Sequence, residues 1–206
     1  MGALLAAERR RAGVLVRRAE RRVAAVVTDE QDQLRDFVRS FMEDKSSEEA
    51  VRAQMETEQG FDPDLIIACD IDQGKLAKLQ QDFAVRTETD NNRAIQQSDI
   101  VILAIKPQVM QQVCRAIDEP AHNPLFISIA AGVRAGDIDR WLCGGRALVR
   151  CMPNTPALVG LGASALFANS LVNPDQQRQA ETIMQSTCIS VWVDDEAQLD
   201  AVTAIS

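Results

Sequence analysis

The sequence predicts a doubly wound α/β fold, in which a mostly parallel sheet is covered by helices on both faces. From residue 63 onward, short apolar segments alternate with amphipathic ones at the spacing of strand–helix–strand units. The segment 98–108 shows this unit most clearly, because an apolar run rich in β-branched residues ends at Lys106-Pro107. Pro107 has no backbone N–H and favours extended geometry at Lys106, so the strand ends there and a helix follows.

The predicted elements follow one another closely along the chain. Strands are expected at residues 65–69, 85–87, 100–105, 125–129, 147–152, 163–168 and 189–193. Helices are expected around residues 76–83, 109–117, 138–142 and 174–187.

Two regions of different composition precede these elements. Residues 1–27 are rich in arginine, and we expect a leader, disordered or loosely helical, that lies outside the fold. A targeting helix is the alternative interpretation. Residues 28–60 are expected to form two amphipathic helices, the first beginning with a capping box of Thr28 and Gln31.

Composition argues against several classes of function. A net charge of −8 and an aromatic content of 4% disfavour a nucleic-acid-binding surface. The five cysteines lack C-x-x-C spacing and His122 is the single histidine, so no metal site is expected. No apolar run approaches the ~20 residues of a membrane span. Reduced, mostly buried thiols are expected, and with them a cytoplasmic location.

The carboxyl ends of four predicted strands define an edge where a ligand would lie in a doubly wound sheet. We call this edge the rim; it comprises Asp70 and residues 104–107, 130–133 and 152–156. Asp70 is an acid at a strand end, which either accepts hydrogen bonds from ribose hydroxyls or is an ordinary strand-end acid or helix cap.

Two other points on the rim have side chains that suit a nucleotide. Ala130, Ala131 and Gly132 would let a flat ring lie close to the backbone, although a tight turn has the same composition. Lys106 either points toward a phosphate or ribose or is an ordinary solvated lysine.

The glycine fingerprint of dinucleotide-binding loops has one formal match, at residues 160–165. It follows a Pro-rich turn and opens a predicted strand, whereas the fingerprint requires a strand before it and a helix after it. We therefore expect no phosphate-binding loop there.

Four motifs occur in the same order as in a known enzyme family. They are residues 98–108 (SDIVILAIKPQ), 127–133 (ISIAAGV), 149–163 (VRCMPNTPALVGLGA) and 192–206 (WVDDEAQLDAVTAIS). Through them, residues 59–206 resemble the N-terminal NAD(P)-binding domain of pyrroline-5-carboxylate reductase. The resemblance implies a Rossmann-like fold and an oxidoreductase of proline biosynthesis. That enzyme transfers hydride from NAD(P)H to 1-pyrroline-5-carboxylate and yields L-proline.

The resemblance also implies places for individual residues. Asp70 would lie at the adenosine ribose and Asn91 beside the adenosine half of the cofactor. The other cofactor-binding residues would be Ala104, Ile105, Lys106, Pro107, Ala130, Ala131 and Gly132, the last three behind the nicotinamide. The substrate pocket would be bordered by Asn154, Thr155 and Pro156. No catalytic residue is identified, and Asp70 would favour NADH over NADPH because it repels a 2′-phosphate.

The sequence departs from the family at both ends. The usual first strand and Gly-rich loop are lacking, and residues 23–27 are apolar enough to replace the strand. Residues about 28–63 weakly resemble the N-terminal helices of an acyl-CoA dehydrogenase instead. After residue 206 the family continues into a helical dimerisation domain that supplies most substrate contacts. We therefore expect an incomplete dinucleotide-binding domain at 61–206, without the dimerisation domain.

These departures leave three interpretations open. The first is a pyrroline-5-carboxylate reductase, homo-oligomeric in the family, that acts on a small molecule but is inactive as this truncated or fused chain. The second is a non-catalytic remnant that binds a dinucleotide or a protein. The third is an acyl-CoA dehydrogenase fragment. None of the three calls for a nucleic-acid or membrane partner.

Overall fold

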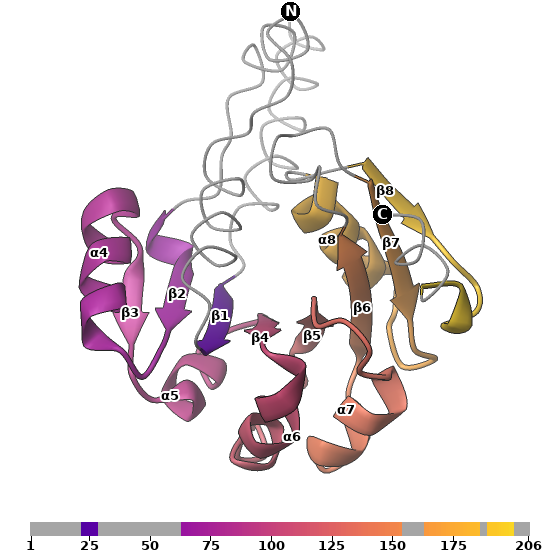
Figure 1. The fold of residues 1–206 in the computed structure, drawn as a ribbon, viewed down its shortest axis with the longest axis horizontal. Coiled ribbons are helices and arrows are strands. Elements are labelled where there is room, and N and C mark those ends of the chain that lie inside the picture. The colour runs from indigo at the N-terminus through magenta and orange to yellow at the C-terminus, as the bar shows by residue number, and fades with distance from the viewer. Residues whose placement is uncertain (1–21, 29–62, 154–162, 186–188, 200–206) are drawn as a thin grey trace, which may run out of the picture.

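The structure is a computed structural model that describes residues 22–28, 63–153, 163–185 and 189–199 (Figure 1). Its centre is an eight-stranded sheet with the strand order β3-β2-β1-β4-β5-β6-β7-β8. All neighbouring strands are parallel except β6 and β7, so the predicted doubly wound, mostly parallel fold is confirmed. The leader before residue 22, the amphipathic helices expected after Thr28, and the segment 154–162 lie outside the described residues.

Strand β1 (Val23–Thr28) fills the position of the first strand. It pairs in parallel with β2 (Ile66–Cys69) on one side and β4 (Ile100–Ile105) on the other. The expectation that residues 23–27 replace the first strand is thus confirmed. The expectation that the whole of 1–27 lies outside the fold is wrong at this end. The physical reason is backbone pairing, because β2 and β4 would otherwise bury unpaired N–H and C=O groups.

The remaining strands extend the sheet in both directions. Strand β3 (Arg86–Glu88) lies outside β2, and β5 (Leu125–Ser128) and β6 (Leu148–Pro153) follow β4. Strand β7 (Ala163–Ala168) runs antiparallel to β6, and β8 (Ile189–Trp192) forms the far edge. The rejected glycine fingerprint therefore leads into a strand, as expected.

Helices cover both faces of the sheet, because its central strands are apolar on both sides. In β4, Ile100 and Ile102 belong to one buried cluster, whereas Val101 and Leu103 belong to another. The first cluster includes side chains of α4 (Gln73–Phe83) and α8 (Pro174–Gln185). The second includes those of α5 (Asn91–Ile95), α6 (Pro107–Arg115) and α7 (Ala135–Trp141). A short 3₁₀ turn, η1 (Pro63–Leu65), precedes β2.

The turn that follows β4 forms as the sequence predicts. Lys106 is the N-cap of α6 in extended geometry, with φ −59° and ψ 139°, and Pro107 is the first helical residue. Proline suits this position because the first N–H of a helix has no partner within the helix. The chain therefore reverses sharply at the rim.

Candidate cofactor-binding rim

The sheet changes direction of winding between β1 and β4. From β1 the chain crosses to β2 and β3 on one side, and β4, β5 and β6 lie on the other. Ligands of doubly wound sheets bind at the carboxyl ends of the strands that flank such a switch point. Here those ends meet in register, with Thr28 paired to Ile105. The ends of β1 and β4 on the predicted rim therefore lie at the switch point.

Asp70 lies at the end of β2 with only 3% of its surface exposed. Its Oδ1 accepts a hydrogen bond of 2.9 Å from the Asp72 N–H. Its Oδ2 is buried without a hydrogen-bond partner, and the Lys75 ammonium lies 3.9 Å from it. A buried carboxylate oxygen that accepts no hydrogen bond is costly even beside the Lys75 ammonium, and a ribose hydroxyl is a donor of the right kind.

The start of α4, next to Asp70, is already occupied by a carboxylate. Asp72 Oδ1 accepts hydrogen bonds from the N–H groups of Gly74, at 2.8 Å, and Lys75, at 3.2 Å. These amides are therefore not available to a phosphate, and the Asp72 charge offsets the positive end of the helix. Between the two aspartates, Ile71 is 81% exposed and offers an apolar surface beside Asp70. Its exposure was not predicted, and its place between two acids was the available sequence signal.

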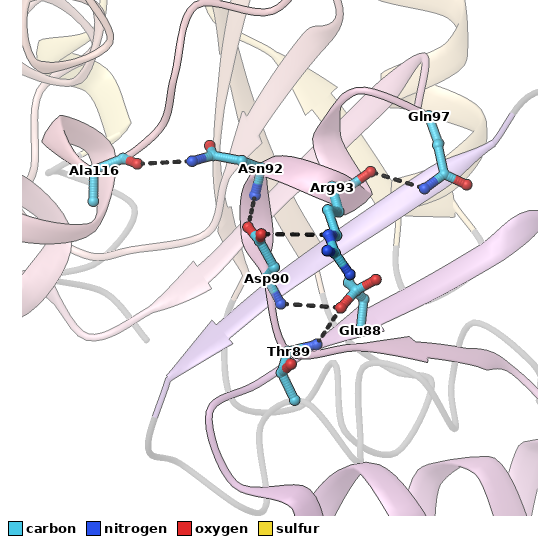
Figure 2. A network of polar contacts seen from close by, with 7 residues as sticks. All are labelled: Glu88, Thr89, Asp90, Asn92, Arg93, Gln97 and Ala116. Carbon is cyan, nitrogen blue, oxygen red and sulfur yellow. Dashed lines mark hydrogen bonds and ion pairs between the residues drawn. The ribbon is translucent and has the colours of Figure 1, made fainter.

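The end of β3 is held by a network of polar contacts (Figure 2). Glu88 Oε1 accepts hydrogen bonds from the N–H groups of Thr89 and Asp90, and Asp90 caps α5 through the Asn92 N–H. The Asn92 amide also donates to the Ala116 carbonyl at 3.2 Å, which ties α5 to the end of α6. Asn91 is the half-buried first residue of α5, beside this network.

Residues 104–107 present mainly backbone to the rim. Ile105 is 5% exposed and packs into the core, so its side chain faces away from a ligand at the rim. Ala104 and Lys106 are half-buried, and Pro107 is exposed. The Lys106 carbonyl accepts a hydrogen bond from the Val109 N–H, which closes the first turn of α6.

The loop between β5 and α7 begins with residues that have small side chains or none. Ala130 is buried, and its N–H lies 3.4 Å from Ser128 Oγ. Ala131 and Gly132 are exposed. Gly132 has a φ of +71°, the left-handed region that favours glycine, which explains why this residue type stands at the turn.

A second ion pair lies close to this loop and was not predicted. Arg150, in β6, donates a 2.7 Å hydrogen bond to Glu196 Oε1, and only 3% of the Arg150 side chain is exposed. The same Glu196 oxygen accepts a 2.6 Å hydrogen bond from the Ala135 N–H, at the start of α7. An arginine within an otherwise apolar strand was the available sequence signal.

Other expectations concern metals, thiols and membranes. Among the described residues, no group of three or more His, Cys, Asp or Glu side chains is placed to hold a metal ion. Burial, together with Glu88, Asp90 and Asp70, raises the pKa of the Cys69 thiol to about 12. Within the same described ranges, no helix is long and apolar enough to span a membrane. The three predicted substrate-facing residues, Asn154, Thr155 and Pro156, lie beyond the described end of β6.

The strand order 3-2-1-4-5-6, the switch point and the acid after β2 together define a Rossmann-type α/β domain. Comparison with known proteins narrows this class. A family model described as "NADP oxidoreductase coenzyme F420-dependent" matches residues 49–132. Pyrroline-5-carboxylate reductase of Pseudomonas aeruginosa is 44% identical over 150 residues, which is 72% of this chain and 55% of that protein. The enzyme of the same name from Synechocystis is 38% identical over 158 residues, covering 77% and 58%.

A solved structure agrees with these relatives. Pyrroline-5-carboxylate reductase from Coxiella burnetii superposes with a TM-score of 0.74 at 30% identity, covering 90% of this chain and 63% of that one. The resemblance of this chain to the N-terminal part of pyrroline-5-carboxylate reductases is therefore confirmed. The chain spans about half the length of the curated relatives it matches. These comparisons give no support to the weak acyl-CoA dehydrogenase resemblance.

Proposed function

We propose that this chain carries the dinucleotide-binding part of a pyrroline-5-carboxylate reductase. The complete enzyme would transfer hydride from NAD(P)H to 1-pyrroline-5-carboxylate and form L-proline. The observation that carries the proposal is Asp70, whose buried Oδ2 lacks a hydrogen-bond partner at the end of β2, beside the switch point. The reaction is that of the similar proteins, which are pyrroline-5-carboxylate reductases.

The rim residues fit the parts of a dinucleotide. Asp70 would accept hydrogen bonds from the adenosine ribose, with Asn91 nearby, and the exposed Ile71 would lie against the adenine. Residues 104–107 would follow the middle of the cofactor, and Ala130, Ala131 and Gly132 would back the nicotinamide. When bound, the cofactor would supply the hydride. These residues would orient the cofactor, and their small side chains would leave room for the nicotinamide ring.

We further propose that the site prefers NADH to NADPH. Asp70 and the Asp72 carboxylate on the first amides of α4 both oppose a 2′-phosphate. Even in water, like charges a few Å apart cost on the order of 1 kcal/mol, or about fivefold in Kd. Titrating the chain with both cofactors tests this, with Asp70→Ser as the variant and Asp82→Ser, on the exposed side of α4, as the control. Tighter binding of NADPH than NADH by the parent chain would overturn the preference.

Turnover would require more than the described residues provide. Holding the nicotinamide within ~3–3.5 Å of the imine carbon can account for ~7–11 kcal/mol of a barrier. Asn154, Thr155 and Pro156 would border the substrate, and the relatives' remaining half would supply further contacts and the homo-oligomer. We therefore expect this chain alone to reduce pyrroline-5-carboxylate far more slowly than an intact reductase. An assay that follows NADH or NADPH absorbance checks this, and turnover within about tenfold of an intact reductase would contradict it. We also propose that the protein is cytoplasmic.

One alternative function is favoured by a specific observation. The Asp72 carboxylate occupies the first amides of α4, which would suit a protein that binds a dinucleotide without catalysis. Measurable NADH affinity without turnover, even when the C-terminal part of a relative is added as a separate chain, would favour this alternative.

A further inference from the structure

The loop from β5 to α7 has a side-chain hydrogen bond at each end, a local one at β5 and one from a distant residue at α7. At the β5 end, Ser128 Oγ lies within hydrogen-bond distance of the Ala130 N–H. At the α7 end, Glu196 Oε1 accepts from the Ala135 N–H at 2.6 Å, across 61 residues of sequence. Helix α7 has no capping side chain of its own, since its N-cap residue Arg134 makes no such bond. Glu196 therefore supplies the missing cap.

Glu196 is itself held in place by a buried arginine. The Arg150 side chain is 3% exposed and donates to the same Oε1 atom at 2.7 Å. Arg150 pairs with Ser128 in the register between β5 and β6, so both loop anchors come from neighbouring positions of the sheet. A buried guanidinium strongly favours a carboxylate beside it, which fixes where Glu196 can lie.

We propose that Glu196 and Arg150 are positioning residues for the loop 129–134, which rests on the proposed function because this loop would back the nicotinamide. Neither side chain is placed among the reacting atoms. Glu196 holds the Ala135 amide in place, and this fixes the backbone of the preceding loop, including Gly132. The backbone conformation at Gly132 determines how closely a flat ring can approach the loop. Glu196 lies in the segment that follows β8. Its hydrogen bond to Ala135 therefore joins that segment to the loop.

The test compares two glutamates that each partner a largely buried arginine. Glu119 bonds to Arg146, whose side chain is 8% exposed, but it makes no bond to the nicotinamide loop. Glu119→Ala is therefore the control for removing a glutamate beside a buried arginine, at a side chain that is 79% exposed, compared with 22% for Glu196. Glu196→Gln keeps an oxygen that can accept from Ala135. Because Glu196→Ala leaves the buried Arg150 charge without its partner, which destabilises the fold, the pair Glu196→Gln and Glu119→Gln repeats the comparison.

The first readout is backbone hydrogen exchange without cofactor, which does not depend on the proposed function. We expect Glu196→Ala to speed exchange at residues 130–135 by about tenfold, Glu196→Gln by less, and Glu119→Ala not at all in this segment. Unchanged exchange there, or an equal rise throughout the sheet, would overturn the proposal. The second readout is the Kd for NADH, which should rise about tenfold in Glu196→Ala and recover largely in Glu196→Gln. If the parent chain binds no NADH, the proposed function and the nicotinamide part of this proposal fail, while the exchange pattern still decides whether Glu196 orders the loop.

Discussion

At the scale of single residues, the buried thiols give the chain a pH dependence. Burial raises the pKa of Cys69 to about 12 from an ordinary value of 9.0, and burial does the same to Cys114. The folded state thus keeps both thiols protonated where the unfolded chain ionises them. Stability from these groups is complete below pH 9 and is lost as the pH rises toward 12.

We therefore expect the urea midpoint to fall as the pH is raised above about 9, and to fall less steeply in Cys69→Ala. The slope with pH is compared, because the cavity left by the substitution lowers the midpoint at every pH. Cys143 is exposed, so Cys143→Ala serves as the control and should keep the parental slope. A parental slope in Cys69→Ala would show that burial does not raise this pKa.

Gly132 gives a second test at this scale, because space and backbone conformation can be separated there. A Cβ at Gly132 or at Gly136 would meet no atom within 4 Å, but only Gly132 has a left-handed φ, of +71°. Gly132→Ala should therefore destabilise by about 1 kcal/mol, whereas Gly136→Ala, in α7, should stabilise by roughly 0.5–1 kcal/mol. Urea unfolding measures both, and equal effects would mean that the loop conformation is wrong.

At the scale of elements, β1 holds the two halves of the sheet together. Ala24 is fully buried between β2 and β4, in a cluster with Ile67 and Cys69. Ala24→Asp should bury an unpaired charge, detach β1 and expose the edges of β2 and β4, with loss of cooperative unfolding and aggregation as the result. Ile189→Asp, at a 73% exposed site on the edge strand β8, is the control and should change stability by less than about 0.5 kcal/mol. A soluble, cooperatively folded Ala24→Asp chain would contradict the topology.

The elements also show how far sequence patterns reach. Most strands from β2 onward follow from apolar runs and turn residues, and Lys106-Pro107 marks where β4 ends. Helix α6 begins at Pro107, two residues before the predicted start of 109. Strand β1 was harder to predict, because it directly follows the Arg-rich segment. Its strand conformation depends on pairing with β2 and β4, which no local pattern shows. Helix α5 was missed because five residues give no helical period, although Asp90 two residues before Asn92 marks its cap.

The candidate site was predictable to a similar degree. Asp70 and the small residues 130–132 were found, since strand ends and side-chain size are visible in a sequence. The pair of Arg150 and Glu196 was not found, because it depends on β6 lying beside β5 and on a turn beyond β8 reaching α7. Contacts between distant segments leave no local pattern.

At the scale of the whole molecule, we propose that one edge of the sheet binds a dinucleotide. The carboxyl ends of β2, β4 and β5 carry the Asp70 oxygen that lacks a hydrogen-bond donor, the turn at Lys106 and the loop with Gly132. The amino ends of the same strands carry none of these features within the described residues. The proposal therefore assigns binding to one end of the strands, and a measurement of binding at each residue tests it.

The most direct measurement is a titration of the ¹⁵N-labelled chain with NADH, followed by amide NMR shifts. We expect saturable shifts at residues 70–72, 104–106, 108 and 129–133, and none at Ile100, Leu125 or Leu148, where the strands begin. Shifts confined to those amino ends, or no saturable shift at millimolar NADH, would contradict the central claim.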